Sequence, residues 1–289
     1  MSDAPVILVT RRSRLARAQA ALAERALIEA DPRRITAILA VTTSGDDHPD
    51  WSLQKEGGKG LFTKEIEDAV LSGEADVAVH SAKDLPTEMH PDLEIAAYLP
   101  RENPADVLVL REGVEEPARI ATGSPRRRAQ LARRFPEATF SELRGNVQTR
   151  LRKITAGEAD ATVLAAAGLH RLGIDRAEGL RFRELPYREM VPASGQGAIA
   201  LQCRRGEAER FAGVGDAPTD YAVRAEKCFL ASLGGGCHAA FAGFLEGETL
   251  FHAFHHEHGY QTVELPRLEP AAFPEFFAGH FRTWIDPAS

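Results

Sequence analysis

The chain has 289 residues, of which 44% are hydrophobic and 27% are charged, so it is long enough for two or three domains of a soluble globular protein. Its net charge of −7 gives no reason to expect nucleic acid or an anionic membrane as a partner. We read no signal peptide at the start and no apolar run that could span a bilayer. The cysteines, Cys203, Cys228 and Cys237, are too few and too scattered for a disulfide framework, and no ligand spacing suggests a metal, so we expect a reducing compartment.

The first elements form a pattern that returns later in the chain. An apolar strand over 6–10 is followed by Ser13 as a helix cap and a helical run to about residue 30. Residues 118–122 are again a strand, followed by Ser124 as a cap and a helical run to about residue 134. A second pair agrees with the first, because Gly-Glu-Ala-Asp precedes a short apolar strand at both 73–76 and 157–160. The order of the two pairs favours an internal duplication over chance.

Strands alternate with helical patterns in each repeat, which predicts two parallel-rich α/β lobes. Ligands in such sheets bind at the carboxyl ends of strands, beside helix N-termini. From about residue 219 the pattern changes to a helix over 221–233, strands over 240–245, 248–255 and 260–265, and a last helix over about 274–284. We therefore expect a small third α+β domain with an antiparallel sheet.

A loop over 43–60 lies between elements of the first lobe and is followed by a helix that we expect over 61–71. It is long for an α/β lobe, and it is rich in glycine, with Lys55 and Lys59 within it. A phosphate-binding loop is one interpretation, but the spacing of that motif is absent. A plain flexible connection is another, and we favour a lid over the ligand site.

Residues 119–153 contain nine arginines and one lysine against two acidic residues, a net charge of +8, so the rest of the chain carries −15. A solvated basic helix face is the usual meaning of such a run. However, Arg126 and Arg127 fall in the first turn after Ser124, where the helix dipole disfavours cations. Their placement favours an anion at this helix start, and arginine suits carboxylates in particular. Charge alone does not separate carboxylate from phosphate.

Asp84 and Cys237 stand out in the remaining sequence. Asp84 follows a strand over 75–80 and would be an acid among cations, able to stabilise a positive charge on a substrate or to move protons, although a lone aspartate in a turn is usually a cap. Cys237 follows three glycines and is expected to be exposed, whereas Cys203 and Cys228 fit buried positions. We interpret Cys237 as an attachment point, since no acid–base constellation of a cysteine protease surrounds it.

The chain resembles the porphobilinogen deaminase family over nearly its whole length. The matching segments occur in family order at family spacing: 10–16, 57–62, 80–84, 122–127, 143–147, 149–151, 167–172, 195–198 and 235–237. The segment after Cys237 departs from the family pattern, as do Arg12, Arg14 and Pro125.

The resemblance implies two lobes similar to type II periplasmic binding proteins and a C-terminal α+β domain. It places domain 1 at 1–99 and 195–213, domain 2 at 100–194 and domain 3 at 217–289. It implies a cytoplasmic monomeric enzyme of haem-type tetrapyrrole biosynthesis that deaminates four porphobilinogen molecules and joins them to a dipyrromethane primer. Hydrolysis releases hydroxymethylbilane, with a transient hand-off to uroporphyrinogen-III synthase.

The resemblance also assigns residues. It implies a thioether from the primer to Cys237, and it makes Asp84 the carboxylate that stabilises the cationic pyrrole nitrogen and assists proton transfer. Expected primer contacts are Ser13, Lys83, Asp84, Thr122, Ser124, Arg126, Arg127, Arg144 and Arg150. Expected substrate contacts are Arg11, Gln19, Lys55, Lys59, Arg150 and Arg171. The main alternative from the residues alone is a bilobed protein that only captures a small anion, and a third is a phosphate-handling transferase that uses the loop at 57–60.

Overall fold

The computed structural model describes residues 4–43, 63–234 and 240–285. The chain forms two compact units, of which unit 1 comprises Met1–Glu102 and Gly197–Tyr221, and unit 2 comprises Asn103–Gln196 and Ala222–Ser289. The boundary near Tyr221 falls inside the helix α7 (Ala217–Ser232). None of the helices in the described part of the chain is both long and apolar enough to cross a membrane.

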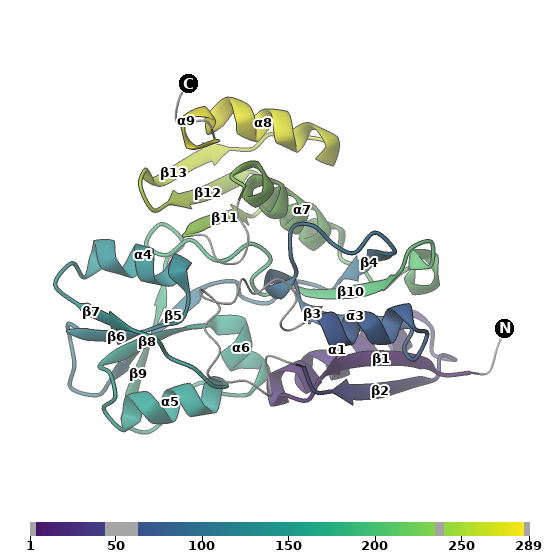
Figure 1. The fold of residues 1–289 in the computed structure, drawn as a ribbon, viewed down its shortest axis with the longest axis horizontal. Helices are drawn as coiled ribbons and strands as arrows, with labels where there is room; N and C mark the ends of the chain where they lie inside the picture. The colour runs from purple at the N-terminus through teal and green to yellow at the C-terminus, as the bar shows by residue number, and fades with distance from the viewer. Residues whose placement is uncertain (1–3, 44–62, 235–239, 286–289) are drawn as a thin grey trace. The chain divides into compact units, whose positions relative to one another are not determined.

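Unit 1 contains a five-stranded mixed sheet in the order β2-β1-β3-β10-β4 (Figure 1). The first three of these strands are parallel, and β10 is antiparallel to both β3 and β4. The bounds of the strands are β1 Val6–Arg11, β2 Thr36–Val41, β3 Val77–Ser81, β4 Leu93–Tyr98 and β10 Ile199–Arg204. The helices are α1 (Arg14–Ala30) and α3 (Lys64–Leu71), with short 3₁₀ turns η1 (Ala82–Asp84) and η2 (Ala208–Phe211).

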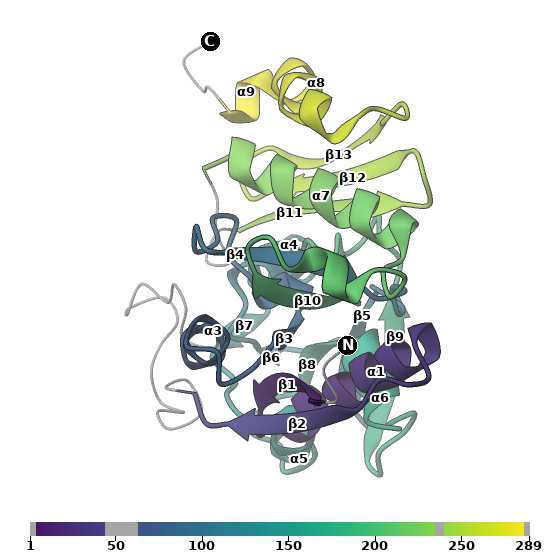
Figure 2. The same ribbon diagram turned by 90° about the vertical axis from the view of Figure 1, so that its right-hand side faces the viewer.

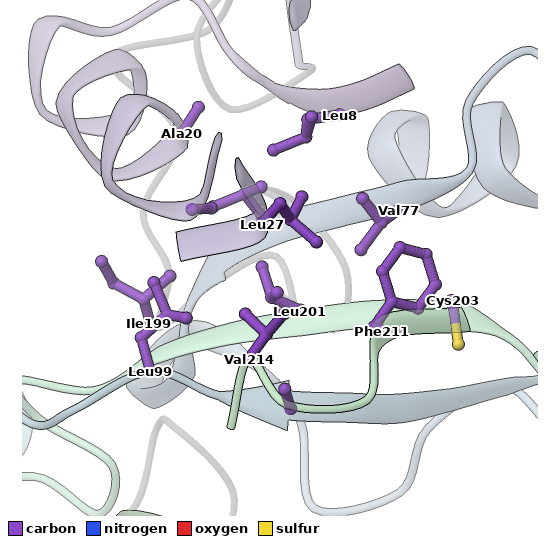
Figure 3. Close-up of a cluster of buried hydrophobic side chains, with 13 residues drawn as sticks. Leu8, Ala20, Leu27, Val77, Leu99, Ile199, Leu201, Cys203, Phe211 and Val214 are labelled. Carbon is purple, nitrogen blue, oxygen red and sulfur yellow. The ribbon is translucent and has the colours of Figure 1, made fainter. Parts of the chain in front are cut away.

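Both faces of this sheet are covered, which explains why its strands are apolar on both sides. On one face Leu8 packs with Leu27 of α1 and with Phe211, in the cluster that Figure 3 shows. On the other face Val9, the next residue of β1, packs with Ile66 of α3. Successive side chains of a strand point to opposite faces, so one short strand supports two cores.

The first sheet of unit 2 has the order β7-β6-β8-β5-β9, in which β7, β6 and β8 are parallel and β5 is antiparallel to both β8 and β9, the same pattern of strand directions as in unit 1. The bounds of its elements are β5 Asp106–Arg111, β6 Arg119–Ala121, α4 Pro125–Arg134, β7 Thr139–Ser141, α5 Val147–Thr155, β8 Ala161–Ala165, α6 Ala166–Arg171 and β9 Leu180–Leu185. Two α/β lobes with parallel-rich mixed sheets were expected from the sequence, and this prediction of the fold class is confirmed.

The repeated Gly-Glu-Ala-Asp segments have the same structural role in both sheets. In unit 1 the Asp76 carboxylate accepts a hydrogen bond from the backbone N–H of Ile7 at 2.9 Å, and its own N–H donates to the Ile7 carbonyl. In unit 2 Asp160 accepts from the N–H of Arg119 at 3.0 Å and donates to the Arg119 carbonyl. Each aspartate thus holds the start of one strand against its neighbour, which accounts for the repeated motif.

Unit 2 also contains the antiparallel sheet β11-β12-β13, along which α7 runs (Figure 2). Its strands are β11 Phe241–Glu246, β12 Leu250–His255 and β13 Gly259–Glu264, followed by η3 Pro270–Ala272, α8 Phe273–His280 and α9 Arg282–Ile285. The single last helix expected at 274–284 is in fact two helices. They are separated at Phe281, which is fully buried. The centroid of its ring lies 4.9 Å from that of Phe229, so the break places Phe281 in the core.

The expected domain boundaries stay a prediction. The small sheet shares unit 2 with the second α/β sheet, and contacts join the two. For example, Val191 packs in one cluster with Ala242 and Phe244, and the Tyr260 hydroxyl donates to the Glu189 carbonyl at 3.0 Å.

The core around Phe229 yields a prediction at Gly243. A Cβ at Gly243 would lie 2.4 Å from Phe229 Cδ1 and 2.9 Å from Phe251 Cζ. We expect Gly243→Ala to lower the free energy of unfolding by roughly 1–3 kcal/mol through overpacking. Gly279→Ala is the matched control, because a Cβ at Gly279 would meet no atom within 4 Å and alanine favours a helix. Equal urea midpoints for the two variants would contradict this account of the core.

Candidate functional site

A pocket of about 70 Å³ lies within unit 1 at the edge where parallel strands end. Arg11 is the last residue of β1 and Ser81 the last of β3, and β1 and β3 are parallel neighbours. The carboxyl ends of parallel strands meet at one edge of a sheet, which brings these residues together. The pocket is lined by Thr10, Arg11, Ser13, Leu15, Ala16, Gln19, Thr63, Ile66, Val79, His80, Ser81 and Asp84.

The helix α1 begins at this pocket. The Ser13 hydroxyl caps the helix by accepting from the N–H of Ala16 at 3.2 Å, as the sequence predicts. One turn further, Gln19 is buried and its amide bonds to the Ser81 hydroxyl, with Nε2 at 2.9 Å. Gln19 therefore joins the helix start to the end of β3.

Asp84 lies in the 3₁₀ turn η1 immediately after β3, together with Lys83. The turn is closed by a hydrogen bond from the N–H of Leu85 to the Ala82 carbonyl. The Asp84 side chain is exposed and lines the pocket. Within the described residues it makes no hydrogen bond or ion pair, so its carboxylate is available to a ligand.

His80 is buried in the floor of the same pocket. Burial lowers the pKa of His80 to about 4, while a hydrogen bond to Gln202 and the charge of Asp84 act in the opposite direction. The Nε2 atom of His80 lies 3.0 Å from Gln202 Oε1. The imidazole is therefore neutral at pH 7.

In unit 2 the corresponding strand end carries Thr122 and Ser124. Thr122 follows β6, and its hydroxyl accepts from the N–H of Ser124 at 3.2 Å. Ser124 caps α4 by accepting from the N–H of Arg127 at 3.4 Å. The strand, threonine, serine cap and helix of the sequence repeat are thus present in both units.

Arg126 and Arg127, at the start of α4, are both buried against the carboxylate of Asp106. Asp106 Oδ2 lies 2.7 Å from Arg126 Nη1, and Asp106 Oδ1 lies 2.6 Å from Arg127 Nη2. Gln196 Nε2 also donates to Oδ1 at 3.0 Å. Burial alone would raise the pKa of Asp106, but the two guanidiniums more than offset it and hold that pKa well below its ordinary value.

This carboxylate explains the placement of the two arginines that the sequence analysis attributed to a bound anion. Asp106 is an internal anion at the position where a bound anion was inferred. Arginines in the first turn of α4 are therefore not by themselves evidence of a ligand. Arg127 directs Nε and Nη2 to Asp106 and Nη1 to the Val163 carbonyl at 2.9 Å. Arg126 uses Nη1 for Asp106 and for the Val191 carbonyl, at 2.7 Å. The predicted contacts of both residues with a primer stay predictions.

Arg144 and Arg150 follow β7, where the strand leads into α5. Arg144 Nε contacts Glu142 at 3.2 Å, and its Nη2 atom is buried with no hydrogen-bond partner in the described part of the chain. Arg150 Nε donates to the Gly145 carbonyl at 2.7 Å. Arg171 is the last residue of α6.

Three expected site residues, Lys55, Lys59 and Cys237, lie outside the described residues, and so does the lid proposed at 43–60 apart from Thr43. The other two cysteines fit the inert positions expected for them. Cys203 is buried and burial raises its pKa to about 11, while burial also raises the pKa of half-buried Cys228. A low thiol pKa, the usual sign of a reactive cysteine, is absent from both.

His255, Glu257 and His258 bring potential metal ligands within 4.8 Å of one another at the β12–β13 turn. However, His255 Nδ1 accepts from the backbone N–H groups of Glu257, at 3.1 Å, and His258, at 3.4 Å. Its Nε2 must then carry the proton of the neutral ring, which leaves no lone pair for a metal. We assign no metal to this cluster.

Sequence reasoning gave no role to Asp106, Gln196, Gln202 or Glu67, and quoted His80 only as part of a motif. Asp106 and Gln202 begin or interrupt otherwise apolar strands, where a polar residue needs a partner. That is the signal that could have found them. Their partners lie far away in sequence, so the sequence alone does not identify them.

The sequence is similar to those of known proteins. The family model described as "Porphobilinogen deaminase, dipyromethane cofactor binding domain" matches residues 6–211. A porphobilinogen deaminase of Sphingopyxis alaskensis is 44% identical in a match that covers 96% of this chain and 87% of the relative. A porphobilinogen deaminase of Syntrophotalea carbinolica is also 44% identical, and that match covers 84% of this chain and 78% of the relative. The periplasmic VFT2 domain of Bordetella pertussis BvgS has a TM-score of 0.44 and 19% identity, covering 72% of this chain and 84% of that domain. The chain belongs to the porphobilinogen deaminase family.

Proposed function

We propose that the pocket of unit 1 is the catalytic centre of this enzyme and that Asp84 is its catalytic carboxylate. The chain is a transferase of tetrapyrrole biosynthesis, which deaminates four porphobilinogen molecules, joins them head to tail on a dipyrromethane cofactor and releases hydroxymethylbilane. The observation that carries the assignment of Asp84 is its position. It is an acceptor without a partner among the described residues, at the ligand-binding edge of the sheet, beside Arg11 and Ser13.

The chemistry of the substrate explains why one carboxylate is needed there. Loss of ammonia from the aminomethyl group breaks a C–N bond and leaves positive charge on the pyrrole nitrogen. The Asp84 carboxylate stabilises this charge while the new C–C bond forms, and it can accept the proton that the attacking carbon loses afterwards. Arginines around the site could not stabilise a cation.

The cationic residues serve the other half of the ligand. Each pyrrole carries an acetate and a propionate, so the growing chain is a polyanion. Arg144 fits such a ligand, because its buried Nη2 is a donor with no acceptor in the described residues. The bound dipyrromethane supplies the nucleophilic carbon, and Thr122, Ser124, Arg144 and Arg150 at the strand ends of unit 2 would hold its carboxylates.

Arg126 and Arg127 differ in what they can offer a carboxylate. Arg127 has an internal acceptor for every side-chain nitrogen, whereas Arg126 keeps Nε and Nη2 outside its described hydrogen bonds. We therefore assign the main contact with the primer to Arg126 and a supporting position to Arg127. Lys83, Arg11, Gln19, Arg171, Lys55 and Lys59 complete the proposed contacts with primer and substrate.

The proposal also covers attachment and cellular context. Cys237 would hold the primer through a thioether, since the other two cysteines lie in buried or half-buried positions with raised pKa values. The boundaries of the three domains, a monomeric state, a cytoplasmic location and a hand-off to uroporphyrinogen-III synthase belong to the same proposal. The hand-off is supported by the reactivity of the hydroxymethyl group of the product.

The role of Asp84 is tested by Asp84→Ala. Losing the carboxylate removes the stabilisation of the pyrrole cation, so we expect kcat to fall by about 10²-fold or more with an unchanged melting temperature. Asp92→Asn, at an exposed carboxylate outside the pocket, is the control and should keep wild-type turnover. Wild-type kcat in Asp84→Ala would refute the assignment.

The attachment site is tested by intact mass. The wild-type protein should be heavier than its sequence by two linked pyrrole units and should give a coloured product in acid Ehrlich reagent. Cys237→Ser should have the mass of its sequence alone, whereas Cys228→Ser should keep the extra mass. A primer still present on Cys237→Ser would move the attachment elsewhere.

The buried charge cluster is tested by Asp106→Ala, which leaves two guanidiniums buried without their carboxylate. We expect the free energy of unfolding to fall by roughly 3–5 kcal/mol, together with poorer primer loading by mass. Glu189→Gln removes the half-exposed partner of Arg134 and should cost about 1 kcal/mol or less. Similar denaturant midpoints for the two variants would show that the Asp106 cluster is not a structural anchor.

A further inference from the structure

A chain of three polar side chains crosses the interior of unit 1 beneath Asp84. His80 on β3 and Gln202 on β10 are diagonal neighbours on one face of the sheet, since Ala200 pairs with His80. His80 Nε2 lies 3.0 Å from Gln202 Oε1, and Gln202 Nε2 donates to Glu67 Oε1 of α3 at 3.1 Å. Gln202 is fully buried and His80 nearly so.

This chain has a defined direction. A carboxylate accepts hydrogen bonds and cannot donate them, so the Glu67 oxygen must face the NH₂ group of Gln202. The carbonyl oxygen of Gln202 then faces His80, and only a protonated Nε2 can donate to it. Glu67 therefore selects, through Gln202, the Nε2–H tautomer of His80.

The consequence concerns the charge beside Asp84. A neutral Nε2–H imidazole has no second N–H, so its Nδ1 can only accept a hydrogen bond and cannot donate one to the Asp84 carboxylate. Asp84 from η1 acts on the imidazole through its charge, Arg11 from β1 lines the same pocket, and Glu67 from α3 is linked to the ring through Gln202, while α1 contributes only uncharged side chains to the pocket. The low pKa of His80, caused by burial, agrees with a neutral ring.

We propose that Glu67 and Gln202 act as positioning residues that fix the Nε2–H tautomer of His80, and that this tautomer, in a ring that burial keeps neutral, leaves the Asp84 carboxylate without a donor or cation from His80 and open to the substrate. The proposal rests on the assigned role of Asp84. An imidazolium at this position would form an ion pair with Asp84 and neutralise the charge that the pyrrole cation requires. A carboxylate in place of Gln202 would favour the imidazolium far more than the neutral amide does.

The direct test exchanges the two side chains in the double variant Glu67→Gln/Gln202→Glu. Net charge and the hydrogen-bonded chain are kept, but the carboxylate now contacts His80 Nε2 and raises the histidine pKa. We expect kcat at pH 7 to fall by about tenfold or more and to recover as pH rises and the imidazolium loses its proton. The mass of the attached primer should not change. Asp68→Asn on the exposed side of α3 is the control and should keep the wild-type pH profile.

Nitrogen NMR of ¹⁵N-histidine-labelled holoprotein gives a readout that does not depend on Asp84. The His80 signals, assigned by their loss in His80→Gln, should show protonated Nε2 and unprotonated Nδ1 at pH 7 in the wild type, and a charged ring in the double variant. An Nδ1–H or charged ring in the wild type would overturn the inference. So would a charged ring in the double variant with unchanged kcat. The role of Asp84 is judged separately, by Asp84→Ala.

If the double variant does not fold, Glu67→Gln alone supplies the test. An amide at position 67 no longer dictates which end of Gln202 faces His80, so signals of both tautomers should appear. A spectrum that keeps the pure Nε2–H form would show that Glu67 does not set the direction of the chain, and would overturn the proposal.

Discussion

The buried carboxylate of Asp106 is the interaction on which the start of α4 depends. Two adjacent guanidiniums at a helix N-terminus repel each other and the helix dipole, and they would not stay buried without a counter-charge. Asp106 supplies that charge on β5, and backbone carbonyls at Val163 and Val191 take further N–H groups. The arrangement therefore fixes the start of α4 through contacts within the protein itself.

Asp84 has the opposite environment. It is exposed on a short turn, and His80, which lines the same pocket, is kept neutral by burial. The two aspartates thus differ in their partners: Asp106 is paired with the protein's own cations, whereas Asp84 has no partner among the described residues, as its proposed role requires. Asp106 begins β5 and Asp84 follows β3, so both carboxylates lie at the ends of otherwise apolar strands.

Much of the fold follows from local sequence patterns. The caps Ser13 and Ser124 and the paired Gly-Glu-Ala-Asp segments predict two similar lobes, and the sheets have the same strand order. The break at Phe281 was missed, because it depends on the packing of Phe229 from a distant helix. The basic cluster predicted an anion at the start of α4, but the sequence could not say that Asp106, on a different strand, is an anion there. The direction of the hydrogen bonds from Glu67 through Gln202 to His80 likewise depends on α3, β10 and β3, three segments that only the fold brings together.

The central claim is that the Asp84 carboxylate, which has no partner among the described residues, faces a pyrrole nitrogen of the bound ligand. The most direct measurement is a crystal structure of the primer-bearing enzyme. We expect an Asp84 oxygen within hydrogen-bond distance, about 2.6–3.2 Å, of a pyrrole nitrogen. An Asp84 side chain turned away from the bound pyrroles, or paired with an arginine or with a protonated His80, would contradict this claim.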